Sequence, residues 1–180
     1  MRAVRFVVIV VMLCAGMSEA VAGQEMVPRA TPATSAIPSG SGVSGRAAPP
    51  VAGRRVDFGD YSSLTLTVRA WEALGRGDAA AVAAYTKMCI TLYEAEAKQQ
   101  QASLKDFASK EHAFEPWALN DVATCYFILG ESLRAQRHSA DARSAFERII
   151  AEFGFAQCWD PRGWFWKVTE GARIRLTVLP

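Results

Sequence analysis

The chain has 180 residues, a hydrophobic fraction of 51% and a formal net charge of +2. This length suits one domain rather than a two-domain enzyme, and the small net charge excludes the broad basic surface that nucleic-acid binding normally requires. The average composition conceals three regions. We expect a signal peptide at 1–22, a linker at 23–56 and a folded domain at 57–180.

The first region begins with the basic residues Arg2 and Arg5, continues with the apolar stretch 6–17, and ends with the small residues Ala20 and Ala22. This pattern is typical of a secretory signal peptide. The apolar stretch is shorter than the roughly 20 residues that a membrane-spanning helix needs. We therefore expect a periplasmic or secreted protein with no stable membrane span after cleavage. Retention by an uncleaved N-terminal anchor is the alternative.

The second region, 23–56, is rich in Pro, Ala, Ser and Gly and has no aromatic residue. Such a segment cannot bury enough apolar surface to offset the entropy lost on ordering its backbone. We expect it to be disordered. It acts either as a spacer that holds the folded domain away from a membrane or wall, or as a tail without a role.

From residue 57 onward, apolar residues recur at spacings of three and four, which predicts amphipathic helices. Gly75 and Gly77 end the first helix, and Asp78 is the expected N-cap of the second. Pro116 suits the first turn of the third helix, and Asp160 followed by Pro161 is expected to begin the fifth. The expected helices span about 62–74, 79–101, 116–133, 139–153 and 160–176. No segment shows sustained alternation, so the predicted fold class is all-α.

Within 129–153, Leu129 and Gly130 are followed by Ala142 and Phe146 at a spacing that resembles a tetratricopeptide repeat. In this pattern, small residues such as Gly130 and Ala142 let two antiparallel helices approach. The aromatic ring of Phe146 then fills the space between adjacent hairpins.

A weaker copy of the pattern lies at 70–92, and placing Gly77 on Arg137 puts the two copies 60 residues apart. The regular repeat is about 34 residues long, so the extension at 93–117 makes the array irregular. The resemblance implies antiparallel helical hairpins, about five helices in all, with the last helix as a C-terminal cap.

The stretches 117–127 and 156–167 resemble a group of exported bacterial tetratricopeptide-like proteins, some of which are labelled glucanase precursors. The resemblance covers about residues 60–176. It implies an interaction or scaffold module of the cell envelope that binds a protein or peptide partner without a cofactor. The partner segment is expected in the groove formed by the first helices of the hairpins.

For such a groove the expected contacts are Asn120, Thr124, Phe127 and Arg134, with Trp159 and Trp166 at one end. Three of the five tryptophans fall within 159–166. This aromatic cluster is either a hot spot for a partner or a structural cap that seals the end of the array. Self-association through the cluster is a second binding hypothesis.

Removal of residues 1–22 leaves three cysteines, Cys89, Cys125 and Cys158. Cys89 and Cys125 lie on apolar stripes, where free cysteine behaves as a small core residue. If one disulfide forms in an oxidising compartment, Cys125–Cys158 is the pair we expect. No Cys-x-x-Cys motif and no ligand-spaced histidine occurs, so no metal site is expected.

The sequence contains no nucleophile elbow of the Gly-x-Ser-x-Gly kind. Glycoside hydrolysis requires two carboxylates about 5–10 Å apart, and Asp121 and Asp160 are candidates because both adjoin aromatic residues. Asp160 is better interpreted as a helix cap, and Asp121 as a polar residue on the face opposite Val122. We therefore expect no enzymatic activity; the alternative is a polysaccharide-acting enzyme or its accessory subunit.

Overall fold

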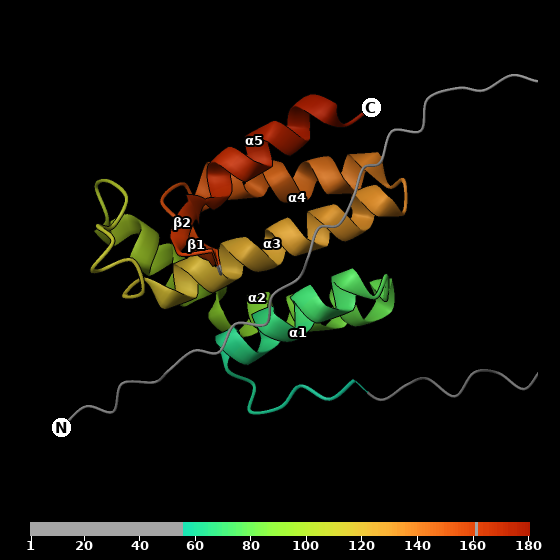
Figure 1. Cartoon of the computed structure of the whole chain (residues 1–180), viewed down its shortest axis with the longest axis horizontal. Helices are drawn as coiled ribbons and strands as arrows, with labels where there is room; N and C mark the ends of the chain where they lie inside the picture. The colour runs from blue at the N-terminus through green and yellow to red at the C-terminus, as the bar shows by residue number, and fades with distance from the viewer. Residues whose placement is uncertain (1–55, 161) are drawn as a thin grey trace, which may run out of the picture. The chain divides into compact units, whose positions relative to one another are not determined.

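The structure, a computed structural model, describes residues 56–160 and 162–180. The expected signal peptide and all but the last residue of the expected linker lie outside these residues. The described chain forms, in order, α1 (Ser63–Gly75), α2 (Ala79–Ser103), α3 (Trp117–Ala135), α4 (Ser139–Glu152), β1 (Gln157–Asp160), β2 (Trp164–Lys167) and α5 (Val168–Val178) (Figure 1). The predominantly helical fold class is confirmed.

The first four helices begin and end within two residues of their predicted bounds. Ser62 Oγ accepts a hydrogen bond from the Thr65 amide at 3.2 Å, and Asp78 Oδ1 accepts one from the Ala81 amide at 3.0 Å. Each bond satisfies an amide that has no partner inside its helix. The prediction of Asp78 as an N-cap is therefore confirmed.

The turns that close the two helical hairpins, α1–α2 and α3–α4, have the same geometry. Gly77 and Arg137 have φ angles of 69° and 63°. In each turn the next amide, of Asp78 or His138, donates to a carbonyl five residues earlier, at 3.0 and 2.9 Å. This is the hydrogen bond of a Schellman motif, in which a left-handed residue ends a helix. The expected correspondence between Gly77 and Arg137 is therefore present in the backbone.

A glycine allows α3 and α4 to pack closely. A Cβ atom added at Gly130 would lie only 2.6 Å from Cε1 of Phe146, so a larger side chain would displace that ring. Phe146 is fully buried, and its ring centroid lies 5.6 Å from that of Phe127, which is one turn before Gly130 in α3. The small-residue contact expected from the sequence therefore lies within one hairpin.

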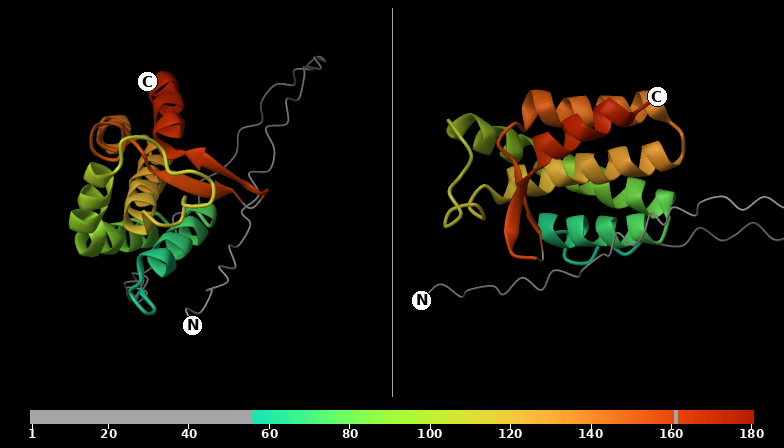
Figure 2. Two further views of the ribbon diagram at one scale, coloured as in Figure 1. Left: turned by 90° about the vertical axis from the view of Figure 1, so that its left-hand side faces the viewer. Right: turned by 45° about the horizontal axis from the view of Figure 1, so that its top comes forward.

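The helices stack in chain order. Helix α3 packs against α1, α2 and α4, and α5 packs against α4 and touches α3. The end-on view in Figure 2 shows α1, α3 and α5 bordering one side, from which the two strands project. The first helices of the two hairpins, α1 and α3, thus lie next to each other.

The fifth helix begins later than predicted. Residues 157–167 form an antiparallel β-hairpin in which Cys158 pairs with Trp166 and Trp159 with Phe165. The prediction of a helix from Asp160 was wrong. In β2 the side chains alternate between the two faces over only four residues, with Trp164 and Trp166 on one face, and so short an alternation does not identify a strand in the sequence. Asp160 instead binds Arg162 in the turn, at 3.0 Å. The expected start at Pro161 lies outside the described residues.

The β-hairpin is held between α3 and the loop that connects α2 to α3. On one face, Trp166 packs against Phe127 of α3, with ring centroids 5.2 Å apart. On the other face, Phe114 of the loop packs against Phe165 and Trp159, with centroids 4.9 and 6.0 Å apart. The loop that connects α2 to α3, which separates the two helical hairpins, therefore covers one face of the β-hairpin.

Candidate binding cleft

An open cleft of about 1130 Å³ lies where the N-terminal ends of α1 and α3 meet. Most of its lining comes from α1 and the turn that precedes it, within residues 57–72. Tyr85 and Tyr93 of α2 and Trp117 and Asp121 of α3 complete the lining. Its volume exceeds that of a typical small-molecule pocket, so the cleft can accommodate an extended ligand.

Asp121 has the most unusual environment in the cleft. Its carboxyl group is surrounded by protein atoms, and burial raises its pKa to about 6, although a hydrogen bond from Ser63 acts in the opposite direction. The Ser63 hydroxyl donates to Oδ2 at 2.5 Å. Ser63 is the one hydrogen-bond donor to this carboxyl group among the described residues, and the Asp121 side chain remains partly open to the cleft. A desolvated carboxylate in a cleft is a candidate functional group.

Asp60 lies in the same cleft in the opposite environment. Hydrogen bonds from Thr65 and Ser62 lower its pKa to about 2. The Ser62 amide and hydroxyl both donate to Oδ1, at 3.0 and 2.8 Å. Asp60 is therefore ionised throughout the physiological range, whereas Asp121 changes its protonation near pH 6.

The remaining charges leave the cleft acidic. Among the described residues, Arg69 is the one cationic side chain in the lining. It forms an ion pair with Asp57 at 2.9 Å and donates to the Asp57 carbonyl. Glu72 lies 3.9 Å from Arg76 of the same helix, so Asp60 and Asp121 remain as excess negative charge. Such a site attracts a cationic group.

Aromatic and aliphatic side chains border these charges. Trp117 is 45% exposed and Leu64 38% exposed. The ring of Trp117 meets Tyr93 edge-on, with centroids 5.5 Å apart, and the Tyr93 hydroxyl donates to the Tyr61 carbonyl at 2.9 Å. Burial, together with the nearby Cys89 side chain and the carboxyl groups of Asp60 and Asp121, raises the pKa of Tyr93. The cleft thus combines a fixed aromatic edge with carboxylates.

Three of the expected groove contacts are buried inside the protein. Asn120, Thr124 and Phe127 are 8%, 2% and 7% exposed. Asn120 donates to the Ala113 carbonyl at 2.7 Å and accepts from the Gln157 amide at 2.8 Å, so it joins the connecting loop and β1 to α3. These residues shape the fold and cannot contact a partner, which corrects the expectation.

The other three expected contacts do not form one surface either. Arg134 is exposed but pairs with Glu131 at 3.0 Å in the last turn of α3. Trp159 and Trp166 occupy alternate positions of the β-hairpin and therefore face opposite sides of it. The aromatic cluster is thus divided between two packing interfaces, and Trp164, 44% exposed, is its most accessible tryptophan.

The three cysteines among the described residues are free thiols, and the expected Cys125–Cys158 bridge is absent. Cys125 is fully buried beside Thr67 of α1. The carboxylate pair considered from the sequence is also divided. Asp160 pairs with Arg162 in the turn of the β-hairpin, whereas Asp121 belongs to the cleft, whose second carboxylate is Asp60.

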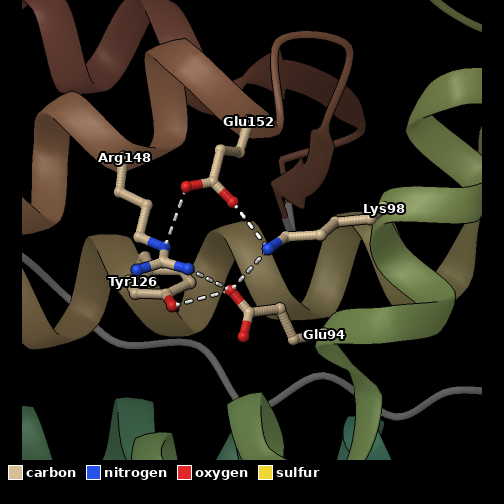
Figure 3. Close-up of polar contacts among 5 residues, drawn as sticks. All are labelled: Glu94, Lys98, Tyr126, Arg148 and Glu152. Atoms are coloured by element: carbon tan, nitrogen blue, oxygen red, sulfur yellow. Dashed lines mark hydrogen bonds and ion pairs between the residues drawn. The ribbon is translucent and has the colours of Figure 1, made fainter.

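A second polar cluster, made of Glu94, Lys98, Tyr126, Arg148 and Glu152, joins α2, α3 and α4 (Figure 3). Glu94 Oε1 accepts from Arg148 at 2.7 Å and from the Tyr126 hydroxyl at 3.2 Å. Lys98 and Arg148 each also pair with Glu152, at 2.9 and 3.3 Å. Burial raises the pKa of Glu94, but the charges of Arg148 and Lys98 lower it overall. Because its charges are mutually compensated, this network fits a structural role.

Among the described residues, no helix has both the length and the apolar character needed to cross a membrane. No family model matches the chain, and neither a curated protein nor a solved structure matches it. The case for function therefore depends on the cleft and on the sequence itself.

Proposed function

We propose that the protein is an interaction module that binds a peptide segment of a partner protein in the cleft between α1 and α3. The observation that carries this proposal is Asp121, a carboxyl group held in an open, partly aromatic cleft with one hydrogen-bond donor, Ser63. A side chain kept in this desolvated environment opposes folding when it is ionised. A ligand that supplies the missing partner would compensate for that effect.

The proposed architecture is tetratricopeptide-like. Support comes from the equivalent turns at Gly77 and Arg137, the contact between Gly130 and Phe146, and the packing of α3 against both helices of the preceding hairpin. In the resemblance described above, partner segments bind along the first helices of successive hairpins. The cleft occupies this position, although its residues differ from those expected from the sequence.

The chemistry of the cleft favours a partner segment that carries lysine or arginine next to an apolar residue. The cation would pair with Asp60 and Asp121, and its aliphatic stem or an apolar neighbour would pack on Trp117 and Leu64. An acidic segment would instead meet the repulsion of these carboxylates.

Selection of random peptides displayed on phage against the full chain tests this proposal. We expect the selected sequences to be enriched in Lys and Arg, and their affinity to fall at least tenfold for Asp121→Asn. Asp160→Asn is the matched control, because that carboxylate lies in the β-hairpin. Selection of acidic or neutral peptides, or equal binding by the two variants, would contradict the proposal.

A polysaccharide-acting enzyme is the second candidate function. One observation favours it: Asp60 and Asp121 line one cleft beside Trp117, and their pKa values are shifted in opposite directions. Divergent pKa values are typical of an acid and base pair. A reducing-sugar assay on β-glucans tests this candidate. Activity that disappears in both Asp60→Asn and Asp121→Asn supports it, and the absence of released sugar contradicts it.

We also propose that the protein is exported, as the basic and apolar pattern of residues 1–22 indicates. Mass measurement of the protein recovered from the cell envelope tests this. A mass that lacks the N-terminal segment up to Ala22 supports signal cleavage. An intact N-terminus in a membrane fraction would indicate the uncleaved anchor instead.

A further inference from the structure

Two cysteines from different helices meet in the core beneath α1. Cys89 of α2 and Cys125 of α3 are both fully buried. Oγ1 of Thr67 in α1 lies 3.3 Å from Sγ of Cys125 and 4.0 Å from Sγ of Cys89. The Cys89 thiol also contributes to the raised pKa of Cys125. The fold therefore brings side chains that are 36 positions apart close together around one hydroxyl group.

The third cysteine lies on another side of α3. The Cys158 thiol of β1 donates to the Trp159 carbonyl at 3.8 Å. Burial raises the pKa of Cys158 to about 11, and the nearby side chains of Thr124 and Trp166 lower it in part. Successive side chains of an α-helix diverge by about 100°, so Thr124 and Cys125 point in different directions from α3. Cys158 consequently faces a different surface of α3 from the one that Cys125 presents to Cys89.

We propose that Cys89 and Cys125 are a disulfide site that joins α2 to α3 and leaves Cys158 as a free thiol. The oxidant is a low-molecular-weight disulfide such as oxidised glutathione. The two thiols give up two electrons and two protons and form one S–S bond, and one glutathione disulfide is reduced to two glutathione thiols. The site is independent of the peptide-binding function, and in the cell it requires the oxidising compartment proposed above.

The surroundings of the pair determine when it reacts. Burial, together with the Cys89 thiol, raises the pKa of Cys125 well above its ordinary value. The protonated thiol is a poor nucleophile, and full burial excludes glutathione from both sulfur atoms. Oxidation therefore takes place while the chain folds, and the completed bridge is then protected from reductants.

Peptide mapping of the full chain tests the site without any substitution. Trypsin places Cys89, Cys125 and Cys158 in three different peptides, 88–98, 111–134 and 149–162. The chain is refolded from urea with reduced and oxidised glutathione, alkylated, digested without reductant and analysed by mass spectrometry. We expect 88–98 linked to 111–134, with 149–162 alkylated, and a fall in free thiols from four, Cys14 included, to two. A link that involves 149–162, or alkylation of all three peptides, would overturn the proposal.

Three further measurements distinguish the site from adventitious oxidation. Cys158→Ser should still form the link between 88–98 and 111–134, whereas Cys89→Ser should leave 111–134 alkylated. The bridged chain should melt about 5 to 10 °C above the reduced chain, because the crosslink restricts the unfolded state. The folded, reduced chain should resist the same glutathione mixture. Rapid oxidation of that form would contradict the burial argument.

Discussion

The β-hairpin at 157–167 and the cleft between α1 and α3 both combine aromatic rings with charges, but their side chains have different partners. In the β-hairpin, Trp166 packs on Phe127, and Asp160 pairs with Arg162. In the cleft, Trp117 is nearly half exposed and Asp121 has a single hydroxyl donor. The density of aromatic residues in a sequence is therefore a poor guide to a binding site. Incomplete pairing in the folded protein is a better one.

The Glu94 network extends the same comparison to carboxylates. Glu94 accepts from Arg148 and Tyr126 and lies 3.5 Å from Lys98, so its charge is compensated by cations from its own helix and from α4. Asp121 has no cationic partner among the described residues. Neutralising Glu94 should therefore lower the free energy of unfolding, whereas neutralising Asp121 should raise it.

The largest loss of stability is expected in the β-hairpin. Trp166→Ala should lower the free energy of unfolding by about 3 kcal/mol, because the ring that packs on Phe127 and next to Gly171 is removed. Trp164→Ala is the control: its ring is 44% exposed and stacks on Arg162, so a change below about 1 kcal/mol is expected. Urea unfolding measures both. Equal losses would remove the distinction between a packed and an exposed tryptophan.

The second largest effect is a gain of stability in the cleft. Asp121→Asn should raise the free energy of unfolding by about 1 to 3 kcal/mol at pH 8. The pKa of Asp121 is about 6 in the folded protein, above its ordinary value of 3.8. The folded state therefore binds more protons, and wild-type stability falls as the pH rises from about 4 to beyond 6. The difference between variant and wild type should disappear below about pH 4.

Asp60→Asn provides a control of opposite sign. Hydrogen bonds lower the pKa of Asp60 to about 2 in the folded protein. The ionised carboxylate therefore stabilises the fold when the pH is above the pKa of the unfolded chain, and this contribution disappears as the pH falls toward 2. We expect this variant to be less stable than wild type at pH 8. If both substitutions changed stability in the same direction, the assigned environments of these carboxylates would be wrong.

A smaller loss is expected from the ion network. Glu94→Gln should lower the free energy of unfolding by about 1 kcal/mol at low ionic strength and by less in 0.5 M salt, because the paired groups are partly exposed. Glu96, two positions further along α2, is exposed and bonds only to Gln100 among the described residues. Glu96→Gln should leave the free energy of unfolding, measured by chemical denaturation, unchanged. An equal loss at both positions would contradict the structural role of the network.

The smallest change in stability is expected at Trp117. Because the ring is 45% exposed and its one aromatic neighbour is Tyr93, Trp117→Ala should alter the free energy of unfolding by less than about 1 kcal/mol. The same substitution should weaken binding of a selected basic peptide at least tenfold. Calorimetric titration and thermal melting on the same sample separate the two quantities. A large drop in melting temperature with unchanged affinity would assign Trp117 to the core.

The helices were predictable because their signals are local. Apolar spacing and the cap at Asp78 identify the first four helices, and Gly130 and Phe146 indicate the close approach of α3 and α4. The β-hairpin was missed because each strand has four residues and its alternation follows a capping pattern that normally starts a helix.

The cleft was not predictable from local patterns. Ser63 and Asp121 are 58 positions apart and come together only when α1 packs beside α3. Asn120 and Thr124 were expected in the partner groove from the geometry of the repeat, yet both are buried and hydrogen-bonded within the α3 region. The one local hint of the cleft was Trp117, a large aromatic residue in the first turn of an otherwise well-packed helix.

The central claim is that a cationic peptide binds in the α1–α3 cleft and not at the aromatic β-hairpin. The most direct test is an NMR titration of the ¹⁵N-labelled full chain with a selected lysine- or arginine-containing peptide. The tryptophan indole N–H signals then serve as reporters of both regions. We predict shifts of the Trp117 indole and of the Ser63 and Asp121 amides, with the Trp164 indole unmoved. Shifts at Trp164 with an unperturbed Trp117 would contradict the claim.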